Sequence, residues 1–180
     1  LFSSDLKPIQ SGELDVLFLC LGHGESRKFL SENTVAEHTK IIDLANDFRL
    51  AAQYTSGNRS FVYGLPEINK KAIQSAHDVA NPGCFATAIQ LGLLPLAKAG
   101  LLEEVYTTGI TGSTGAGQSP SSTSHFSWRA NNIQAYKTLT HQHLGEIAQS
   151  LMQVSPPETH ATQELSFVPW RGDFTRGIFV

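Results

Sequence analysis

Cys84 is the residue whose position in this chain best suits chemistry, because it stands between a turn and a helix. Pro82 fixes its own φ and biases Asn81 toward an extended conformation, while Gly83 permits backbone angles that other residues resist. The apolar residues that follow predict a helix. A thiol at a helix N-terminus faces unpaired N–H groups and the positive end of the helix dipole, which favours the nucleophilic thiolate. The sequence therefore predicts that Cys84 is a nucleophile.

The second cysteine, Cys20, has a different setting. It lies in the apolar run 16–21, which is typical of a buried strand, so we expect it to be a small apolar core residue. A disulfide between Cys20 and Cys84 is formally possible, but nothing else indicates a secreted, disulfide-stapled domain. We therefore expect a reducing, cytoplasmic setting.

The composition narrows the class of protein. The 180 residues are 41% hydrophobic and carry a formal net charge of −3, so they form no basic field that would attract nucleic acid. No run approaches the roughly 18 apolar residues of a membrane helix, and residues 1–10 lack a signal-peptide pattern. We expect a globular protein that binds neither nucleic acid nor membrane and holds no metal. Because the chain does not begin with Met, we expect a piece of a longer protein.

Strands and helices alternate in the first half of the chain, which predicts right-handed βαβ crossovers, a parallel sheet and an α/β fold. Strands are expected at 15–21, 40–44 and 77–80, and helices at 25–37 and 66–76. A boundary near residues 80–84 precedes a second part. There we expect helices at 84–99 and 141–154, strands at 104–110, 132–139, 164–170 and 177–180, and a long loop at 111–124.

Six blocks of the sequence resemble one known family, in the order in which that family carries them. The blocks are Asp15–Leu19 with His23-Gly24, Ile42–Leu44 with Asp47–Leu50, Val62–Glu67, Val79–Ala88 with Gly92 and Pro95, Gly112–Gly117, and His141–Ile147. Together they resemble N-acetyl-γ-glutamyl-phosphate reductase, an NADPH-dependent oxidoreductase of arginine biosynthesis. The resemblance covers nearly the whole chain. Gln142 and Gly145 stand where arginine and proline are more usual, and both leave the histidines in place.

The resemblance implies two domains. Residues 1–82 would be the remainder of an NADP-binding Rossmann-like domain with a partial parallel sheet. Residues 83–180 would be an α+β catalytic and dimerisation domain of the semialdehyde-dehydrogenase type, incomplete at its C-terminus. Family members begin with a strand and a glycine-rich turn that binds the dinucleotide pyrophosphate, and this sequence shows neither. We therefore expect this piece to be inactive alone and the longer protein to be a homo-oligomer, a dimer or tetramer.

The reaction implied by the resemblance is the reductive dephosphorylation of an acyl phosphate to an aldehyde. Cys84 would attack the acyl phosphate and expel phosphate, leaving a thioester that NADPH reduces. His143 would be the acid/base, because an imidazole titrates near neutral pH and can activate a thiol and later protonate an oxygen. The alternative for His143 is a structural histidine.

Three residues would contact the substrate in such an enzyme. Arg49 is a candidate for the substrate's phosphate or carboxylate, because guanidinium binds oxyanions through two parallel hydrogen bonds. An ordinary ion pair with Asp47 or Glu67 is the alternative for Arg49. The resemblance also places Asn81 and His141 on the substrate side.

Five residues would contact the cofactor. His23 and Gly24 follow the first strand, in the block that faces the cofactor in the family. Ser113, Gly115 and Ala116 belong to the glycine- and serine-rich loop, which we expect to cradle a nicotinamide ribose or phosphate through exposed N–H groups. A surface loop without a ligand is the alternative for this segment.

Three other functions remain open from the sequence. A related phosphorylating dehydrogenase, such as one acting on aspartyl phosphate, is disfavoured by the glycine before Cys84 and the Phe-Ala-Thr after it. A cysteine hydrolase would use Cys84 and His143 to form the same thioester and pass it to water. The third is a folded module with no activity of its own.

Overall fold

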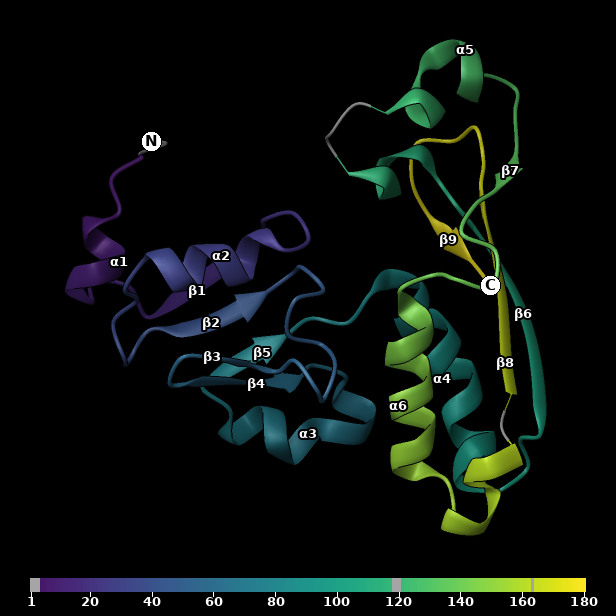
Figure 1. The fold of residues 1–180 in the computed structure, drawn as a ribbon, viewed down its shortest axis with the longest axis horizontal. Coiled ribbons are helices and arrows are strands. Elements are labelled where there is room, and N and C mark those ends of the chain that lie inside the picture. The colour runs from purple at the N-terminus through teal and green to yellow at the C-terminus, as the bar shows by residue number, and fades with distance from the viewer. Residues whose placement is uncertain (1–3, 118–120, 163) are drawn as a thin grey trace. The chain divides into compact units, whose positions relative to one another are not determined.

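The computed structural model describes residues 4–117, 121–162 and 164–180. The chain forms two compact units, Leu1–Gly83 and Cys84–Val180, and each is built around its own sheet (Figure 1). The first unit carries a largely parallel sheet and the second a mixed one. The predicted α/β class is therefore confirmed.

The first unit has a five-stranded sheet in the order β1-β2-β5-β4-β3, in which the first four strands are parallel. The β1–β2 and β4–β5 crossovers run in opposite directions across the sheet. Right-handed connections therefore place α2 and α3 on opposite faces, as Figure 1 shows. The elements are α1 Lys7–Ser11, β1 Val16–Leu19, α2 Glu25–Glu32, β2 Lys40–Asp43, β3 Thr55–Ser56, β4 Arg59–Tyr63, α3 Pro66–Ser75 and β5 Asp78–Ala80.

The core of the first unit lies between β1, β2 and β5 and the segments that cross them. Ile41 and Ala80 are fully buried, and Leu19 is 3% exposed. The rings of Phe48 and Phe61 stack with centroids 4.1 Å apart, so the loop after β2 is fastened to β4. This packing fixes the carboxyl ends of the parallel strands, where ligands of open α/β sheets bind.

Two expectations for the first unit are wrong. Cys20 is exposed rather than buried, because β1 ends at Leu19 and Cys20 lies outside the paired part of the strand. The helix expected to reach residue 37 ends at Glu32, since Asn33 adopts an extended conformation. The hairpin of β3 and β4 was not foreseen, because these strands are short and their pattern is weak.

The second unit packs helices against a four-stranded sheet in the order β7-β8-β6-β9. Its two long helices, α4 Cys84–Lys98 and α6 His143–Val154, lie side by side on one face with their N-termini at the same end (Figure 1). The remaining elements are β6 Glu104–Thr111, η1 Ser113–Ala116, η2 Ser122–Ser124, α5 Phe126–Arg129, β7 Gln134–Ala135, η3 Pro157–Thr162, β8 Glu164–Arg171 and β9 Ile178–Phe179.

The strand expected over residues 132–139 is also a wrong prediction. Only Gln134–Ala135 pairs with β8. Lys137 and Leu139 have φ values of 44° and 57°, a left-handed conformation that cannot continue a strand. The N–H of Thr140 donates to the carbonyl of Lys137, which closes a turn. This turn directly precedes the segment that leads into α6.

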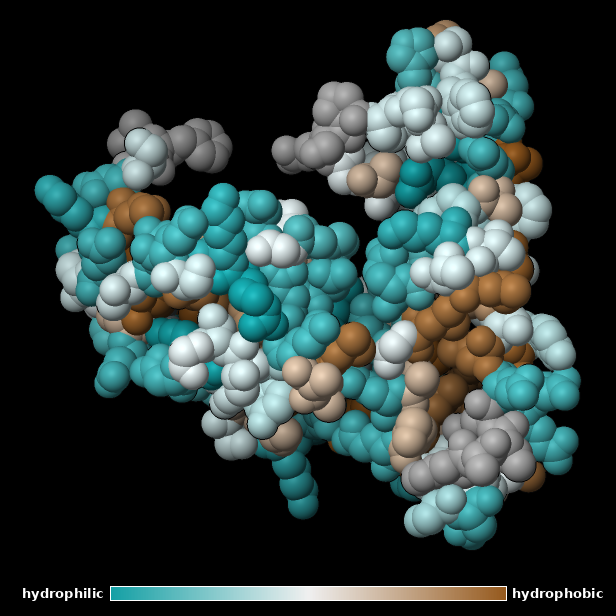
Figure 2. Space-filling view, viewed as in Figure 1, coloured by the Kyte–Doolittle hydropathy of each residue, from teal (hydrophilic) through white to brown (hydrophobic). Residues whose placement is uncertain are grey.

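Apolar side chains remain at the surface of the second unit. Figure 2 shows hydrophobic residues around α4 and α6, and Leu91, Leu96 and Met152 are among those exposed on these helices. On the outer face of the sheet, Tyr106 is 76% exposed. Each helix in the described part of the chain is too short or too polar to span a bilayer.

Candidate active site

Cys84 is the first residue of α4, and its side chain is free and exposed. The helix is held by the next residue, Phe85, which is only 1% exposed and packs edge-on against Phe167 of β8 with centroids 5.1 Å apart. Gly109 in β6 makes room for this ring, since a Cβ there would lie 2.6 Å from Phe85 Cε1. Close approach of helix and sheet thus fixes the helix start that carries the thiol.

The ring of Phe85 also connects the cysteine to two histidines. Its centroid lies 5.8 Å from the ring of His141 and 6.4 Å from that of His143, and the two imidazoles are 4.5 Å apart. Because Phe85 directly follows Cys84, the start of α4 that carries the thiol lies beside the two imidazoles near the start of α6 (Figure 1). The structure thus brings together two chain segments that carry three predicted site residues and are far apart in the sequence.

His141 is held in its neutral form. Burial, followed by the nearby charges of His143 and Lys137, lowers the pKa of His141 to about 4. Its Nδ1 accepts the backbone N–H of His143 at 3.2 Å, so the ring proton is on Nε2. A neutral imidazole of this kind donates a hydrogen bond rather than exchanging protons at pH 7. This state suits a side chain that contacts a substrate oxygen.

Glu146 adds a carboxylate beside His143. It is 2% exposed, and its Oε1 lies 3.9 Å from His143 Nε2 one turn earlier on the same helix. A buried carboxylate beside an imidazole can orient the ring. The sequence reasoning assigned Glu146 no role, although its i, i+3 spacing from His143 places both on one helix face.

Tyr136 and Arg171 border the cluster on the sheet side. The Tyr136 ring centroid is 5.8 Å from that of His141, and the Arg171 guanidinium carbon is 4.5 Å from the Tyr136 centroid. Burial raises the pKa of the Tyr136 hydroxyl, and the charge of Arg171 and its hydrogen bond to the phenol partly offset this rise. No motif pointed to Arg171, because only strand pairing brings it here.

Two predicted substrate residues belong to the first unit. Arg49 is 5% exposed, and one of its guanidinium nitrogens donates to the carbonyl of Leu44 at 2.9 Å. Asn81 is exposed, and its backbone N–H donates to the carbonyl of Asp43 at 2.8 Å, which fixes it just after β5. The substrate role of both residues stays a prediction.

The turn after β1 carries His23 and Gly24. Gly24 has φ 86° and its N–H donates to Asp47 Oδ1 at 2.6 Å, while the N–H of Arg27 donates to Asp47 Oδ2 at 2.9 Å. The carboxylate of Asp47 thus occupies the N-terminus of α2, where a phosphate would otherwise be favoured. His23 is exposed, and its Nδ1 accepts the N–H of Asn46. The cofactor role of both stays a prediction.

The glycine- and serine-rich loop begins as the short helix η1, Ser113–Ala116. Its first N–H groups are already engaged, because Ser113 donates to the carbonyl of Phe174 at 2.8 Å and Thr114 to that of Thr175 at 3.1 Å. Gly115 is exposed and Ala116 is half-buried. An incoming ligand would therefore find these two positions more accessible than the amide of Ser113. Their cofactor role stays a prediction, and residues 118–120 of the loop lie outside the described residues.

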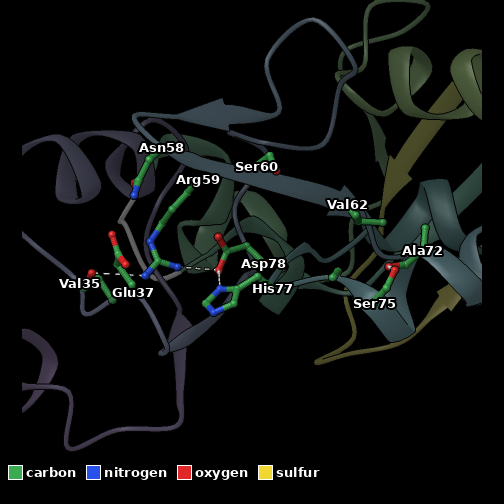
Figure 3. Close-up of a pocket in the computed structure, with 11 residues that line it drawn as sticks. Val35, Glu37, Asn58, Arg59, Ser60, Val62, Ala72, Ser75, His77 and Asp78 are labelled. Carbon is green, nitrogen blue, oxygen red and sulfur yellow. Dashed lines mark hydrogen bonds and ion pairs between the residues drawn. The ribbon is translucent and has the colours of Figure 1, made fainter.

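A separate cavity of about 600 Å³ opens in the first unit (Figure 3). Arg59 donates to Asp78 Oδ1 at 2.8 Å and to the carbonyl of Ala36 at 2.8 Å, and His77 Nδ1 lies 3.2 Å from the same carboxylate oxygen. These groups start β4 and β5, at the edge opposite the strand carboxyl ends. Arg59 and Asp78 form an ion pair, so this cluster links the starts of β4 and β5 and stabilises the sheet.

Metal and disulfide chemistry find no support in the described residues. Within residues 4–117, 121–162 and 164–180, no group of three or more His, Cys, Asp or Glu side chains is arranged to hold a metal ion. Cys20 and Cys84 are both free thiols.

Two family models match this chain, one in each of the two units. Residues 84–180 match the dimerisation domain of semialdehyde dehydrogenases, and residues 2–76 match the NAD-binding domain of the same enzymes. The chain belongs to the semialdehyde dehydrogenase family.

Its most similar curated relatives here share one name. The chain is 57% identical to the N-acetyl-gamma-glutamyl-phosphate reductase of Flavobacterium johnsoniae, with 99% of this chain and 53% of that protein covered. It is 55% identical to the protein of the same name from Christiangramia forsetii, with 92% and 50% covered. The chain spans about half the length of the curated relatives it matches.

Solved structures share the fold at much lower identity. Two aspartate semialdehyde dehydrogenase II structures from Vibrio cholerae superpose with TM-scores of 0.62 and 0.66 at 16% and 14% identity. They cover 91% and 97% of this chain, and 53% and 56% of their own. The likeness confirms the semialdehyde-dehydrogenase type of fold expected from the sequence.

Proposed function

We propose that this chain is part of an NADPH-dependent reductase that converts N-acetyl-γ-glutamyl phosphate to N-acetylglutamate semialdehyde in arginine biosynthesis. The observation that carries the proposal is an exposed thiol at the start of α4, next to Phe85, whose ring packs against two buried imidazoles. The substrate is proposed from relatives named N-acetyl-gamma-glutamyl-phosphate reductase, which are 52–57% identical to this chain. The aspartyl-phosphate alternative has less support, because those structures share only the fold.

Cys84 is the proposed nucleophile. Its thiolate attacks the acyl carbon, the carbon–oxygen bond to phosphate breaks, and phosphate leaves, so that a thioester forms on the sulfur. His143 takes the thiol proton and later returns a proton to the oxygen of the reduced carbon, with Glu146 3.9 Å away to orient it. The neutral His141 donates from Nε2 to the carbonyl oxygen. Collapse of the thiohemiacetal then releases the aldehyde and restores the thiol.

NADPH, when bound, supplies the hydride that reduces the thioester carbon. The first unit fits a dinucleotide because its parallel strands β1, β2 and β5 end at one edge. The turn there is open, since a Cβ on Gly24 would meet no atom within 4 Å. We propose that His23 and Gly24 contact the cofactor, together with Ser113, Gly115 and Ala116.

We propose that the substrate contacts Asn81, which is exposed directly after β5, and His141 of the second unit. Arg49 remains a candidate, although its burial and its bond to Leu44 fit a structural role equally well. We also propose domain limits at 1–82 and 83–180. The first domain would bind the cofactor, and the second would carry out catalysis and dimerisation.

The oligomeric state and the compartment are also proposals. The outer face of the β7-β8-β6-β9 sheet exposes Tyr106 and Thr108, whereas α4 and α6 cover the inner face. We propose that a second copy of this chain covers the outer face. Tyr106→Asp should then dissociate the oligomer, which analytical ultracentrifugation would measure. Two free, exposed cysteines suit a reducing compartment such as the cytoplasm.

The test of the activity uses the full-length protein. Reduction of NADP is followed with N-acetylglutamate semialdehyde and phosphate as substrates, for the wild type and for Cys84→Ser and Cys20→Ser. We expect Cys84→Ser to abolish turnover and Cys20→Ser to retain it. Turnover in Cys84→Ser equal to wild type would remove the thioester step. NADP-independent hydrolysis of the acyl phosphate would instead indicate a cysteine hydrolase.

A further inference from the structure

The cavity of about 600 Å³ in the first unit has no role in the proposed reaction. It lies where β4 and β5 start, at the edge of the sheet opposite the strand carboxyl ends (Figure 3). Its lining comes from the segment before β2, from β4, from the end of α3 and from the start of β5. A volume of this size is within the range that holds small organic ligands.

Asp78 is the most deeply buried residue that lines this cavity, with a side chain only 2% exposed. Its Oδ1 accepts the N–H of Ile41 at 3.0 Å and the guanidinium of Arg59 at 2.8 Å, and His77 Nδ1 lies 3.2 Å away. Its Oδ2 accepts no hydrogen bond from the residues that the structure describes, and Figure 3 shows this oxygen on the side away from His77. A buried carboxylate oxygen without a donor is costly, so a ligand that donates a hydrogen bond there is favoured.

Arg59 lines the same cavity, but its guanidinium is already engaged. One terminal nitrogen donates to Asp78 and, at 3.2 Å, to the carbonyl of Thr39. The other donates to the carbonyls of Ala36 at 2.8 Å and Val35 at 3.4 Å. The ion pair with Asp78 balances its charge. An anion in the cavity would therefore find few free donors on this guanidinium.

The charge that remains at the cavity is negative. Glu37 lines it and is exposed, and none of the ion pairs among the described residues includes this carboxylate. The α3 helix ends at Ser75, which also lines the cavity, and its last turn carries no basic residue. The negative end of the helix dipole thus adds to the charge of Glu37. Val62 and Ala72 supply apolar parts of the wall, against which a short hydrocarbon chain can pack.

We propose that this cavity binds a primary alkylammonium ion. The ammonium group donates to Asp78 Oδ2, Glu37 balances its charge, and the alkyl chain lies against Val62 and Ala72. This site goes beyond the proposed function and does not depend on it, because all of its residues belong to the first unit and lie away from the strand carboxyl ends.

The test titrates the full-length protein with n-butylammonium chloride, followed by saturation-transfer NMR of the ligand. We expect saturable binding of n-butylammonium, and much weaker binding of n-butanol and butyrate at the same ionic strength. Butyltrimethylammonium keeps the charge but has no N–H to donate to Asp78 Oδ2, so it should bind at least about tenfold more weakly.

The matched variants change one carboxylate each. Glu37→Gln should weaken n-butylammonium binding by about fivefold, the upper end for an exposed ion pair. Glu32→Gln removes the same charge from an exposed position on α2 outside the cavity, and it should bind as the wild type does. Ala72→Leu places a larger side chain in the cavity and should abolish binding. Turnover of NADP should stay at the wild-type rate in all three variants, which also shows that they fold.

Four outcomes would overturn the site: no saturable binding of n-butylammonium, equal affinity for n-butanol, equal affinities of Glu37→Gln and Glu32→Gln, or full binding by Ala72→Leu. Equal affinity for butyltrimethylammonium would refute the hydrogen bond to Asp78. If the wild type bound n-butylammonium in this pattern but failed to reduce NADP, the proposed function would fall and the ammonium site would stand.

Discussion

Acidification should weaken the second unit through one residue, His141. The pKa of this imidazole falls from 6.5 in the unfolded chain to about 4 in the folded protein, chiefly because it is buried. Between these values the unfolded chain binds the proton and the folded protein does not. The contribution of His141 to stability is therefore fully present above pH 6.5 and is lost as the pH falls toward 4.

The size of this loss follows from the two pKa values. Each pKa unit is worth about 1.4 kcal/mol, so acidification to below pH 4 should cost the second unit about 3 kcal/mol through this residue alone. That is a large share of the roughly 5–15 kcal/mol by which domains are usually stable.

The assay is urea unfolding between pH 7.5 and 4 followed by tryptophan fluorescence, which reports the second unit because both tryptophans lie there. His141→Asn keeps an acceptor near the His143 N–H but cannot titrate, so its stability should fall less steeply over this range. The exposed His125→Asn serves as the control and should follow wild type. If His141→Asn and wild type lost stability in parallel, the neutral, buried state of His141 would be refuted.

Three further predictions concern single contacts. Asp47→Ala should destabilise the first unit by about 2 kcal/mol by removing the acceptor for the Gly24 and Arg27 amides, and hydrogen exchange should accelerate at both. Leu139→Gly should raise the melting temperature of the second unit, because relief of its left-handed conformation is worth about 1 kcal/mol; an unchanged value would argue against strain there. Arg59→Met should lower the free energy of unfolding of the first unit by about 3–5 kcal/mol, measured by urea unfolding followed by circular dichroism. Adding Asp78→Asn should recover part of this stability. Equal stability of Arg59→Met and wild type would contradict a stabilising role for the Arg59–Asp78 ion pair.

The parallel sheet of the first unit was predictable because its strands are local and strongly patterned. The runs at Val16–Leu19 and Lys40–Asp43 are apolar and bounded by turn residues, and a helix separates them. The exposure of Cys20 was not predictable, since the apolar run 16–21 does not show at which residue the strand ends. The end of a strand depends on its pairing with neighbouring strands, and no local pattern encodes that pairing.

In the second unit the sequence by itself determined the chemistry available: a thiol at a helix start, two histidines two residues apart, and the family whose blocks they carry. The tertiary structure decided how these groups behave. Packing of α4 and α6 on β6 and β8 brought the helix start that carries Cys84 beside the imidazoles, and burial made His141 neutral. Strand pairing alone delivered Arg171 to the same place. Spacing along a chain identifies the reactive groups, but their charge states and partners depend on burial and on contacts between distant segments.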